Sequence, residues 1–261
     1  APRPKATAPV VEVPPEQDAD DDFHGELRQT LIEAWPSTLG AIRSQFQSIV
    51  KADTEDTRTQ LIGNLHRRLH MLTGSAGITG LVQVAQFTDA LEALLKELHE
   101  NPASFNASTL RTLAASVDFL GELFEQSKTG PRKTPVVRVL VVEDEEIARR
   151  AILFALEKSR LKAVSVEDPV KALDMVLVNK FDLVILDVGL PNMNGFELCA
   201  KLRTLPAYKK TPVVFVTSLN DFDSRANSTV SGGNDFIAKP FMFVELAVKA
   251  LIHALRGRLK H

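Results

Sequence analysis

The sequence predicts two domains: an N-terminal all-α helical bundle and a C-terminal doubly wound α/β domain. In the first half, leucine and alanine recur at spacings of three and four, which is typical of amphipathic helices. In the second half, short runs rich in β-branched residues alternate with helical patterns, which indicates a series of βαβ units. A stretch with proline and glycine separates the halves, and 261 residues suffice for two domains of ordinary size.

The N-terminal half begins with residues 1–22, which are rich in proline and acidic side chains. They have little apolar surface to bury, so we expect a disordered leader. Residues 23–126 then carry the helical stripes that predict the bundle. One such stripe consists of Leu61, Leu65, Leu69 and Leu72. Residues 127–135 (S-K-T-G-P-R-K-T-P) are predicted to be a linker to the second domain.

The C-terminal half, residues 136–260, is predicted to contain a parallel sheet that is buried on both faces, because its strand-like runs are largely apolar. The runs that we interpret as strands are 136–142, 183–186, 213–216 and 236–238. Helical patterns lie at 147–158, 170–179, 196–202 and 244–255. This alternation is the pattern of a doubly wound fold.

The composition excludes several classes of protein. A formal net charge of −2 provides no basic field for nucleic acid or a membrane surface. The single cysteine, Cys199, excludes an internal disulfide and a thiolate-rich metal site, and it fits a reducing compartment such as the cytoplasm. No apolar run reaches the roughly 18 residues of a membrane helix, and no signal-peptide pattern is present. The chain begins at Ala1 rather than at a methionine, which favours a piece of a longer protein.

Polar side chains follow the predicted strands at the points where the strands end. Because the carboxyl ends of parallel strands meet at one edge of a sheet, we expect these side chains to converge there. The side chains concerned are Glu143, Asp144, Asp187, Thr217, Ser218 and Lys239. Three carboxylates, hydroxyl groups and an ammonium group should therefore share one pocket.

The chemistry of this pocket favours phosphoryl transfer. Three carboxylates repel one another and need a cation, and oxygen ligands without histidine or cysteine favour a hard ion such as Mg²⁺. A carboxylate beside Mg²⁺ is suited to attack phosphorus, which would form an aspartyl phosphate. Lys239 and Thr217 are placed to hold the phosphoryl oxygens that the metal does not neutralise.

Residues 136–259 resemble the receiver domain of two-component response regulators, which has a five-stranded flavodoxin-like sheet. Four motifs carry the resemblance, in this order: V-L-V-V-E-D-E at 139–145, V-I-L-D-V-G-L-P-N-M-N-G at 184–195, V-V-F-V-T-S at 213–218 and D-F-I-A-K-P-F at 235–241. The resemblance implies that Asp187 is the phosphorylated residue. It also implies a phosphoryl-binding role for Thr217 and Lys239.

The same resemblance implies further features of the site. Asp144, Asp187 and the backbone carbonyl of Gly189 are expected to ligate Mg²⁺, with Glu143 acting directly or through water. A cis peptide bond is expected between Lys239 and Pro240. Two positions depart from the commonest pattern: Glu143 stands where many members have aspartate, and Phe236 stands where the switch aromatic is often tyrosine. A readout that depends on a tyrosine hydroxyl is therefore excluded.

A second candidate site surrounds His70, in the pattern L-H-R-R-L-H-M-L-T-G-S-A-G. If this segment is helical, the leucine stripe points into the bundle and His70 is exposed on another face. Residues at offsets of three, four or seven share that face: Gly63, His66, Arg67, Thr73, Gly74 and Gly77. Glycine inside a helix costs about 1 kcal/mol relative to alanine. Small residues such as Gly74 would let another protein approach the imidazole closely, as direct group transfer requires.

This segment resembles the histidine phosphotransfer (HPt) domain, a helical bundle with one phosphorylated histidine. The match consists of H-M-L-T-G-S-A-G at 70–77, Gly80 and L-E-A-L-L at 91–95, within residues 23–126. The resemblance implies four helices and a phosphorylated His70. Thr73 occupies the position where the family usually has lysine, so Arg67 or Arg68 is expected to stabilise the phosphoryl group instead.

The motifs that are missing also define the function. No ATP-binding kinase motif, Walker-type loop or helix-turn-helix is recognisable, so we expect a phosphoryl carrier rather than an enzyme. The leading hypothesis is a phosphorelay protein whose partner is a sensor histidine kinase or another relay protein, with His70 and Asp187 exchanging phosphoryl groups with each other or with separate partners. One alternative is the regulatory part of a larger protein, such as a diguanylate cyclase, with a C-terminal output domain. Another is a phosphorylation-gated scaffold, and a homodimer through the receiver is also expected.

Overall fold

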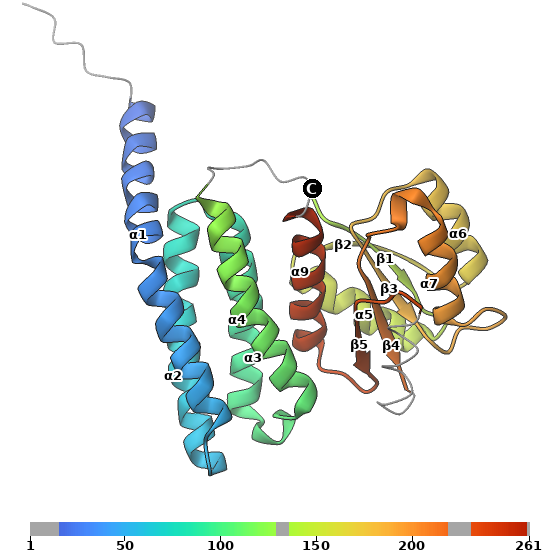
Figure 1. The fold of residues 1–261 in the computed structure, drawn as a ribbon, viewed down its shortest axis with the longest axis horizontal. Coiled ribbons are helices and arrows are strands. Elements are labelled where there is room, and N and C mark those ends of the chain that lie inside the picture. The colour runs from blue at the N-terminus through green and yellow to red at the C-terminus, as the bar shows by residue number, and fades with distance from the viewer. Residues whose placement is uncertain (1–15, 129–135, 219–230, 260–261) are drawn as a thin grey trace, which may run out of the picture.

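The computed structural model describes residues 16–128, 136–218 and 231–259, and its helical and α/β domains lie side by side (Figure 1). The helical domain consists of α1 (Glu16–Val50), α2 (Glu55–Ile78), α3 (Val82–Glu100), the 3₁₀ turn η1 (Pro102–Ser104) and α4 (Ala107–Ser127). These four helices confirm the predicted bundle. No helix in the described part of the chain is long and apolar enough to cross a membrane.

Two helix starts in the bundle are capped by their sequence. Thr54 precedes α2, and its hydroxyl accepts a hydrogen bond from the backbone N–H of Thr57 at 3.2 Å. Asn106 precedes α4 and forms a capping box with Thr109. Such caps satisfy backbone donors that the first helical turn leaves without a partner. They explain why α2 and α4 begin where they do.

The N-terminal boundary differs from the expected one. Helix α1 begins at Glu16, inside the segment 1–22 that was predicted to be a disordered leader. The acidic residues of this segment favour a helix start, because negative charge is stabilised at a helix N-terminus. Residues 1–15 lie outside the described residues. Helix α4 extends to Ser127, the first residue of the predicted linker, and residues 129–135 of that linker also lie outside the described part.

The α/β domain contains a parallel five-stranded sheet in the order β2-β1-β3-β4-β5. Its strands are β1 (Arg138–Val142), β2 (Lys162–Val166), β3 (Leu183–Asp187), β4 (Val213–Thr217) and β5 (Asp235–Ala238). Its helices are α5 (Glu146–Lys158), α6 (Pro169–Val178), α7 (Gly195–Thr204) and α9 (Phe243–Leu259), with a 3₁₀ turn η2 at Pro206–Tyr208. The doubly wound prediction is therefore confirmed. The chain reverses its direction of winding between β1 and β3, where such folds bind ligands.

Strand β2 has no counterpart among the runs that the sequence analysis located. Its sequence, K-A-V-S-V, mixes polar and apolar residues, and its residues are exposed or half-buried. It lies at the edge of the sheet, beside β1 alone. An edge strand needs fewer apolar side chains than a central one, so its pattern is weak.

The two domains share one hydrophobic core. Helix α9 lies between the sheet and the helices α3 and α4 (Figure 1). Buried leucines of the bundle, such as Leu98 and Leu120, belong to the same cluster as Leu251 and Leu255 of α9. A second cluster fills the opposite face of the sheet, beneath α6 and α7. The bundle therefore packs against the receiver-like fold as a further layer.

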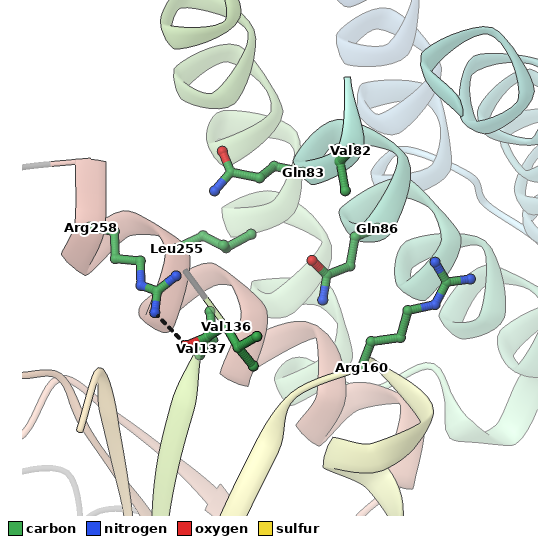
Figure 2. A pocket seen from close by; sticks show the side chains of 8 residues that line it. All are labelled: Val82, Gln83, Gln86, Val136, Val137, Arg160, Leu255 and Arg258. Carbon is green, nitrogen blue, oxygen red and sulfur yellow. Dashed lines mark hydrogen bonds between the residues drawn. The ribbon is translucent and has the colours of Figure 1, made fainter. Parts of the chain in front are cut away.

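The contact between the two domains contains a cavity at the amino-terminal edge of the sheet. The cavity has a volume of ≈ 220 Å³. Gln83 and Gln86 of α3 line one side, and Leu255 of α9 lines another (Figure 2). Beside it, the Gln86 amide donates a hydrogen bond to the Ser159 carbonyl at 2.7 Å. Arg258 closes another side by donating to the Val136 carbonyl at 2.9 Å. This cavity is at the opposite edge of the sheet from Asp187.

Candidate functional site

Three carboxylates converge at the carboxyl ends of β1 and β3. The two strands are adjacent and in register, with Val142 beside Leu186, so the residues that follow are brought together. Oxygen atoms of Glu143, Asp144 and Asp187 all lie within 4.8 Å of one another. Glu143 and Asp187 are buried, whereas Asp144 is exposed. The convergence expected from the strand ends is thus present.

Lys239 bridges the two buried carboxylates. Its Nζ atom is 2.8 Å from Oε2 of Glu143 and 2.9 Å from Oδ1 of Asp187. The Lys239 backbone N–H donates to the Thr217 carbonyl at 2.7 Å, which places the lysine beside the end of β4. Thr217 is buried and lies one strand away from Asp187. The expected cis peptide between Lys239 and Pro240 is confirmed.

The electrostatics of the pocket leave negative charge in excess. Burial raises the pKa of Glu143, although the hydrogen bond from Lys239 opposes the rise. Burial alone would lower the pKa of Lys239, but its hydrogen bonds to Glu143 and Asp187 outweigh burial and raise it. Oε2 of Glu143 is buried and accepts no hydrogen bond of good geometry, although it lies close to the ammonium group. Three carboxylates facing one ammonium group fit an additional hard cation with oxygen ligands.

Gly189 borders this pocket on the solvent side. It follows β3 and is exposed. A Cβ atom at this position would lie 3.1 Å from Oδ2 of Asp187. Glycine therefore keeps space open beside the carboxylate, and its proposed role as a carbonyl ligand stays a prediction.

His70 is on the exposed face of α2, as expected. Its Nδ1 atom lies 2.9 Å from Oε2 of Glu92 on α3, and the side chain of His70 is 76% exposed against 12% for Glu92. Thr73 donates a hydrogen bond to Glu92 and also contacts Thr88 on α3. Thr73 thus supports Glu92, a contact that a lysine side chain could not make by accepting or donating in the same way because it carries no hydroxyl group.

The neighbours predicted for His70 divide into two groups. Gly74 and Gly77 are exposed, and no atom lies within 4 Å of a Cβ built on either, so the surface near His70 is open. A Cβ built on Gly63 would instead lie 3.2 Å from the ring of His99, within the contact between α2 and α3. Arg67 donates to Asn64 at 2.5 Å, so in this structure its guanidinium group is engaged away from His70.

Two further residues lie at these sites although no sequence pattern predicted their contacts. Glu92 lies in the L-E-A-L-L motif, but only the pairing of α2 with α3 brings it to His70. Arg111 of α4 has its guanidinium carbon 5.8 Å from the ring centroid of Phe236, the predicted switch residue on β5. No local sequence signal marks either contact, because the partners are far apart in the chain.

The comparisons with known proteins agree with both resemblances. A model of the response regulator receiver domain matches residues 139–251, and a model of the Hpt domain matches residues 26–125. The transcriptional activator protein IrlR of Burkholderia pseudomallei is 34% identical over 124 residues, which are 48% of this chain and 53% of that protein. Protein RcaC of Microchaete diplosiphon is 31% identical over 121 residues, 46% of this chain and 19% of that protein.

Solved structures show the same kind of similarity. The receiver domain of a signal transduction histidine kinase from Syntrophus aciditrophicus is 32% identical, with a TM-score of 0.42, and covers 45% of this chain and 90% of that one. The chain spans about half or less of the length of the curated relatives cited above. Together with the family models, the fold and the motifs lead to one identification. The chain contains an Hpt domain followed by a response regulator receiver domain, which are phosphotransfer and regulatory modules of two-component signalling.

Proposed function

We propose that this chain is a phosphorelay protein with two phosphoryl carriers, Asp187 and His70, and no kinase activity of its own. The observation that carries the proposal is the bridge from Lys239 to Glu143 and Asp187, at 2.8 and 2.9 Å, beside the third carboxylate. A structural salt bridge would need only one carboxylate. Three of them at the carboxyl ends of parallel strands require a cation and leave a nucleophile at its side.

At the receiver site, Asp187 is the proposed nucleophile. A carboxylate oxygen attacks the phosphorus of a phosphohistidine, the new O–P bond forms, and the P–N bond breaks with its electron pair remaining on the imidazole nitrogen. Mg²⁺ held by Glu143, Asp144 and Asp187, with the Gly189 carbonyl, would neutralise the phosphoryl oxygens. Lys239 and Thr217 donate hydrogen bonds to the remaining oxygens.

At the Hpt site, His70 is the proposed nucleophile and Glu92 positions it. A carboxylate can only accept a hydrogen bond, so Glu92 holds the proton on Nδ1 of the ring. The lone pair is then on Nε2, which is free to attack the phosphorus of a partner's aspartyl phosphate. Thr73 in turn hydrogen-bonds Glu92 and limits its motion.

The docked arrangement favours separate partners for the two carriers. Helix α9 covers the sheet, α3 packs against α9, and α2 with His70 lies beyond α3 (Figure 1). Two helical layers of about 10 Å each separate His70 from the Asp187 pocket, whereas transfer requires reacting atoms about 3 Å apart. Asp187 would therefore take its phosphoryl group from a histidine kinase or another relay histidine. His70 would exchange with the aspartate of another receiver.

A labelling experiment tests each carrier. Acetyl phosphate with Mg²⁺ should add one phosphoryl group to the full chain, and Asp187→Asn should abolish this labelling whereas His70→Gln should not. A separately phosphorylated receiver protein should label Asp187→Asn at His70, and His70→Gln should remove that label. Persistent labelling of Asp187→Asn by acetyl phosphate would refute the assignment of the aspartate.

The arrangement of carriers has its own test. An equimolar mixture of the two single variants should pass phosphoryl groups between chains at a rate that rises with protein concentration. Wild-type transfer that is independent of concentration would instead mean that His70 and Asp187 meet within one chain.

A further inference from the structure

The receiver presents one face, formed by β5 and α9, to the Hpt domain of the same chain. Near the carboxyl end of the sheet, Arg111 of α4 lies over the ring of Phe236 on β5, 5.8 Å from its centroid. Further along this contact, Arg256 of α9 makes a two-pronged ion pair with Glu122 of α4, with both N···O distances 2.8 Å. The planar guanidinium group makes this second contact directional.

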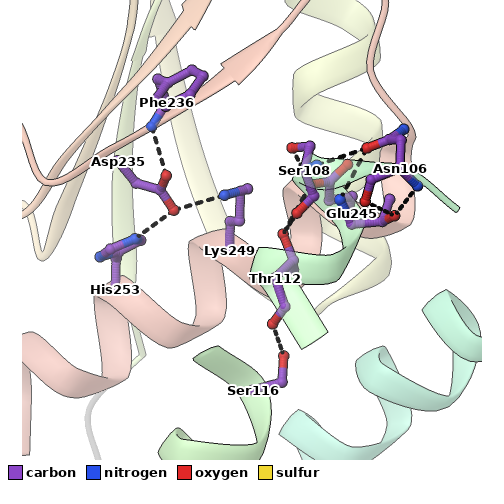
Figure 3. Close-up of polar contacts among 10 residues, drawn as sticks. Asn106, Ser108, Thr112, Ser116, Asp235, Phe236, Glu245, Lys249 and His253 are labelled. Atoms are coloured by element: carbon purple, nitrogen blue, oxygen red, sulfur yellow. Dashed lines mark hydrogen bonds and ion pairs between the residues drawn. The ribbon is translucent and has the colours of Figure 1, made fainter. Parts of the chain in front are cut away.

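A buried polar contact lies beside Arg111, one residue along α4. Glu245, in the first turn of α9, is 4% exposed. Its Oε1 atom accepts hydrogen bonds from Ser108 at 2.7 Å and from Thr112 at 2.8 Å, both on α4 (Figure 3). Because a buried carboxylate without partners is costly, these bonds select one register of α9 against α4. The domains are therefore docked in a specific way rather than merely adjacent.

Helix α9 is also tied directly to β5. Asp235 on β5 accepts from Lys249 at 2.8 Å and lies 3.1 Å from Nε2 of His253, both on α9 (Figure 3). Burial would raise the pKa of Asp235, but these two partners outweigh it and hold the pKa well below its usual range. Asp235 thus acts as a charged anchor. Movement of β5 must be transmitted to α9 or break this anchor.

Strand β5 connects the Asp187 pocket with the Hpt domain. Lys239, which directly follows this strand, holds Asp187 and Glu143, while Phe236 within it contacts Arg111. Only two residues separate Phe236 from Lys239, so a displacement of the lysine backbone reaches the aromatic ring over a short length of strand. The same strand carries the Asp235 anchor of α9.

We propose that the Hpt domain senses the phosphorylation state of Asp187 through β5, with Arg111 on Phe236 as the sensing contact. The inference rests on the proposed function of Asp187. When an oxygen of Asp187 bonds to phosphorus and the donor's bond to phosphorus breaks, one carboxylate oxygen loses its charge. Lys239 then pairs with the new phosphoryl oxygens, and β5 adjusts to that new position. Phe236 moves relative to Arg111, and the contact between α4 and the receiver changes.

The coupling must act in both directions. If phosphorylation of Asp187 changes the contact between the domains, a change in that contact must change the phosphorylation equilibrium of Asp187. A substitution of Arg111 in the Hpt domain should therefore shift the phosphorylation equilibrium of Asp187, although Arg111 does not contact Asp187. The β5–α9 face is also occupied by the chain's own Hpt domain. A receiver homodimer through this face would have to displace it.

The first test substitutes Arg111 in the full chain. Arg111→Gln and Arg111→Ala should each change the Kd for the phosphoryl mimic beryllium fluoride, measured with Mg²⁺, by about two- to fivefold, the range expected for losing a partly exposed cation–π contact. Arg43→Ala is the matched control, since Arg43 is exposed and belongs to α1, which lies on the side of the bundle away from the receiver (Figure 1). It should leave this Kd unchanged. Equal Kd values in all four proteins would overturn the proposal.

The second test measures amide hydrogen exchange in wild-type protein before and after phosphorylation. Exchange should change in residues 107–116 of α4 and should not change in Asp187→Asn treated identically. If Asp187 is labelled and α4 exchange is the same in both states, the sensing contact is refuted while the proposed function stands. If Asp187 takes no label at all, the proposed function itself fails.

Discussion

The two proposed phosphoryl-carrier sites differ in how deeply their side chains are buried. Asp187 is 5% exposed, pairs with Lys239 and lies beside two further carboxylates. The His70 side chain is 76% exposed and pairs with Glu92. Buried charges interact more strongly than exposed ones, because the local dielectric is lower. Under the proposed function, the Asp187 pocket would provide the electrostatic stabilisation for transfer, whereas His70 would provide an accessible nucleophile positioned by Glu92.

The largest expected effect comes from removing the ammonium group of Lys239 at the receiver site. Lys239→Ala should slow labelling of Asp187 by acetyl phosphate about 100-fold, because one charged donor to the phosphoryl oxygens is lost. The initial rate of labelling measures this effect. Lys201→Ala, an exposed lysine on α7, is the control and should behave as wild type. A loss below about threefold would show that the buried machinery is not needed.

The second prediction concerns the buried charge that anchors α9. Asp235→Asn should lower the free energy of unfolding at pH 7 by about 2 kcal/mol, because Lys249, 5% exposed, loses its charged partner. Since the folded pKa of Asp235 is depressed, its stabilisation is present above the ordinary pKa of 3.8 and is lost as pH falls below it. Denaturant unfolding at several pH values measures both effects.

A matched substitution controls for the loss of charge alone. Asp174→Asn, on the exposed face of α6, should leave both the free energy of unfolding and its acid dependence nearly unchanged. Identical acid profiles for Asp235→Asn and wild type would contradict the anchor.

Glu92 is expected to position the His70 ring for transfer. Glu92→Ala should reduce phosphoryl transfer to His70 about tenfold, since the ring loses the acceptor that selects its tautomer, and such supporting contacts typically matter at this level. Transfer from a phosphorylated receiver measures the effect. Glu100→Ala, exposed on the same helix, should transfer normally. If Glu92→Ala also transfers normally, His70 needs no positioning residue.

The smallest effect is expected at the open surface beside His70. Gly74→Ala should raise the free energy of unfolding by up to about 1 kcal/mol, because the glycine is inside a helix and a methyl group there meets no neighbour. It should nevertheless slow transfer to a partner receiver by crowding its approach. Gly40→Ala, at an exposed position of α1, should give the same stabilisation without slower transfer. Equal transfer rates in the two variants would mean that Gly74 is not part of the partner surface.

Much of the receiver site was predictable because its residues sit at the ends of strongly apolar strands. Glu143, Asp187 and Thr217 follow or end runs of buried β-branched residues, and parallel pairing then brings them together. The weakly patterned strand β2 and the start of α1 at Glu16 were not predictable in the same way. In both segments the local sequence does not strongly favour one secondary structure. Packing decides that β2 forms, and charge at the helix N-terminus favours the start of α1.

By itself, the sequence determined the two folds, the order of the domains and the nucleophilic candidates His70 and Asp187, because periodicity and motifs are local properties of the chain. Only the tertiary structure decided that Glu92 holds His70 and that Arg111 lies over Phe236. It also decided that Glu245 of α9 is buried against α4. These contacts join residues far apart in the chain, and they exist because apolar faces of α3, α4 and α9 bury one another in a shared core.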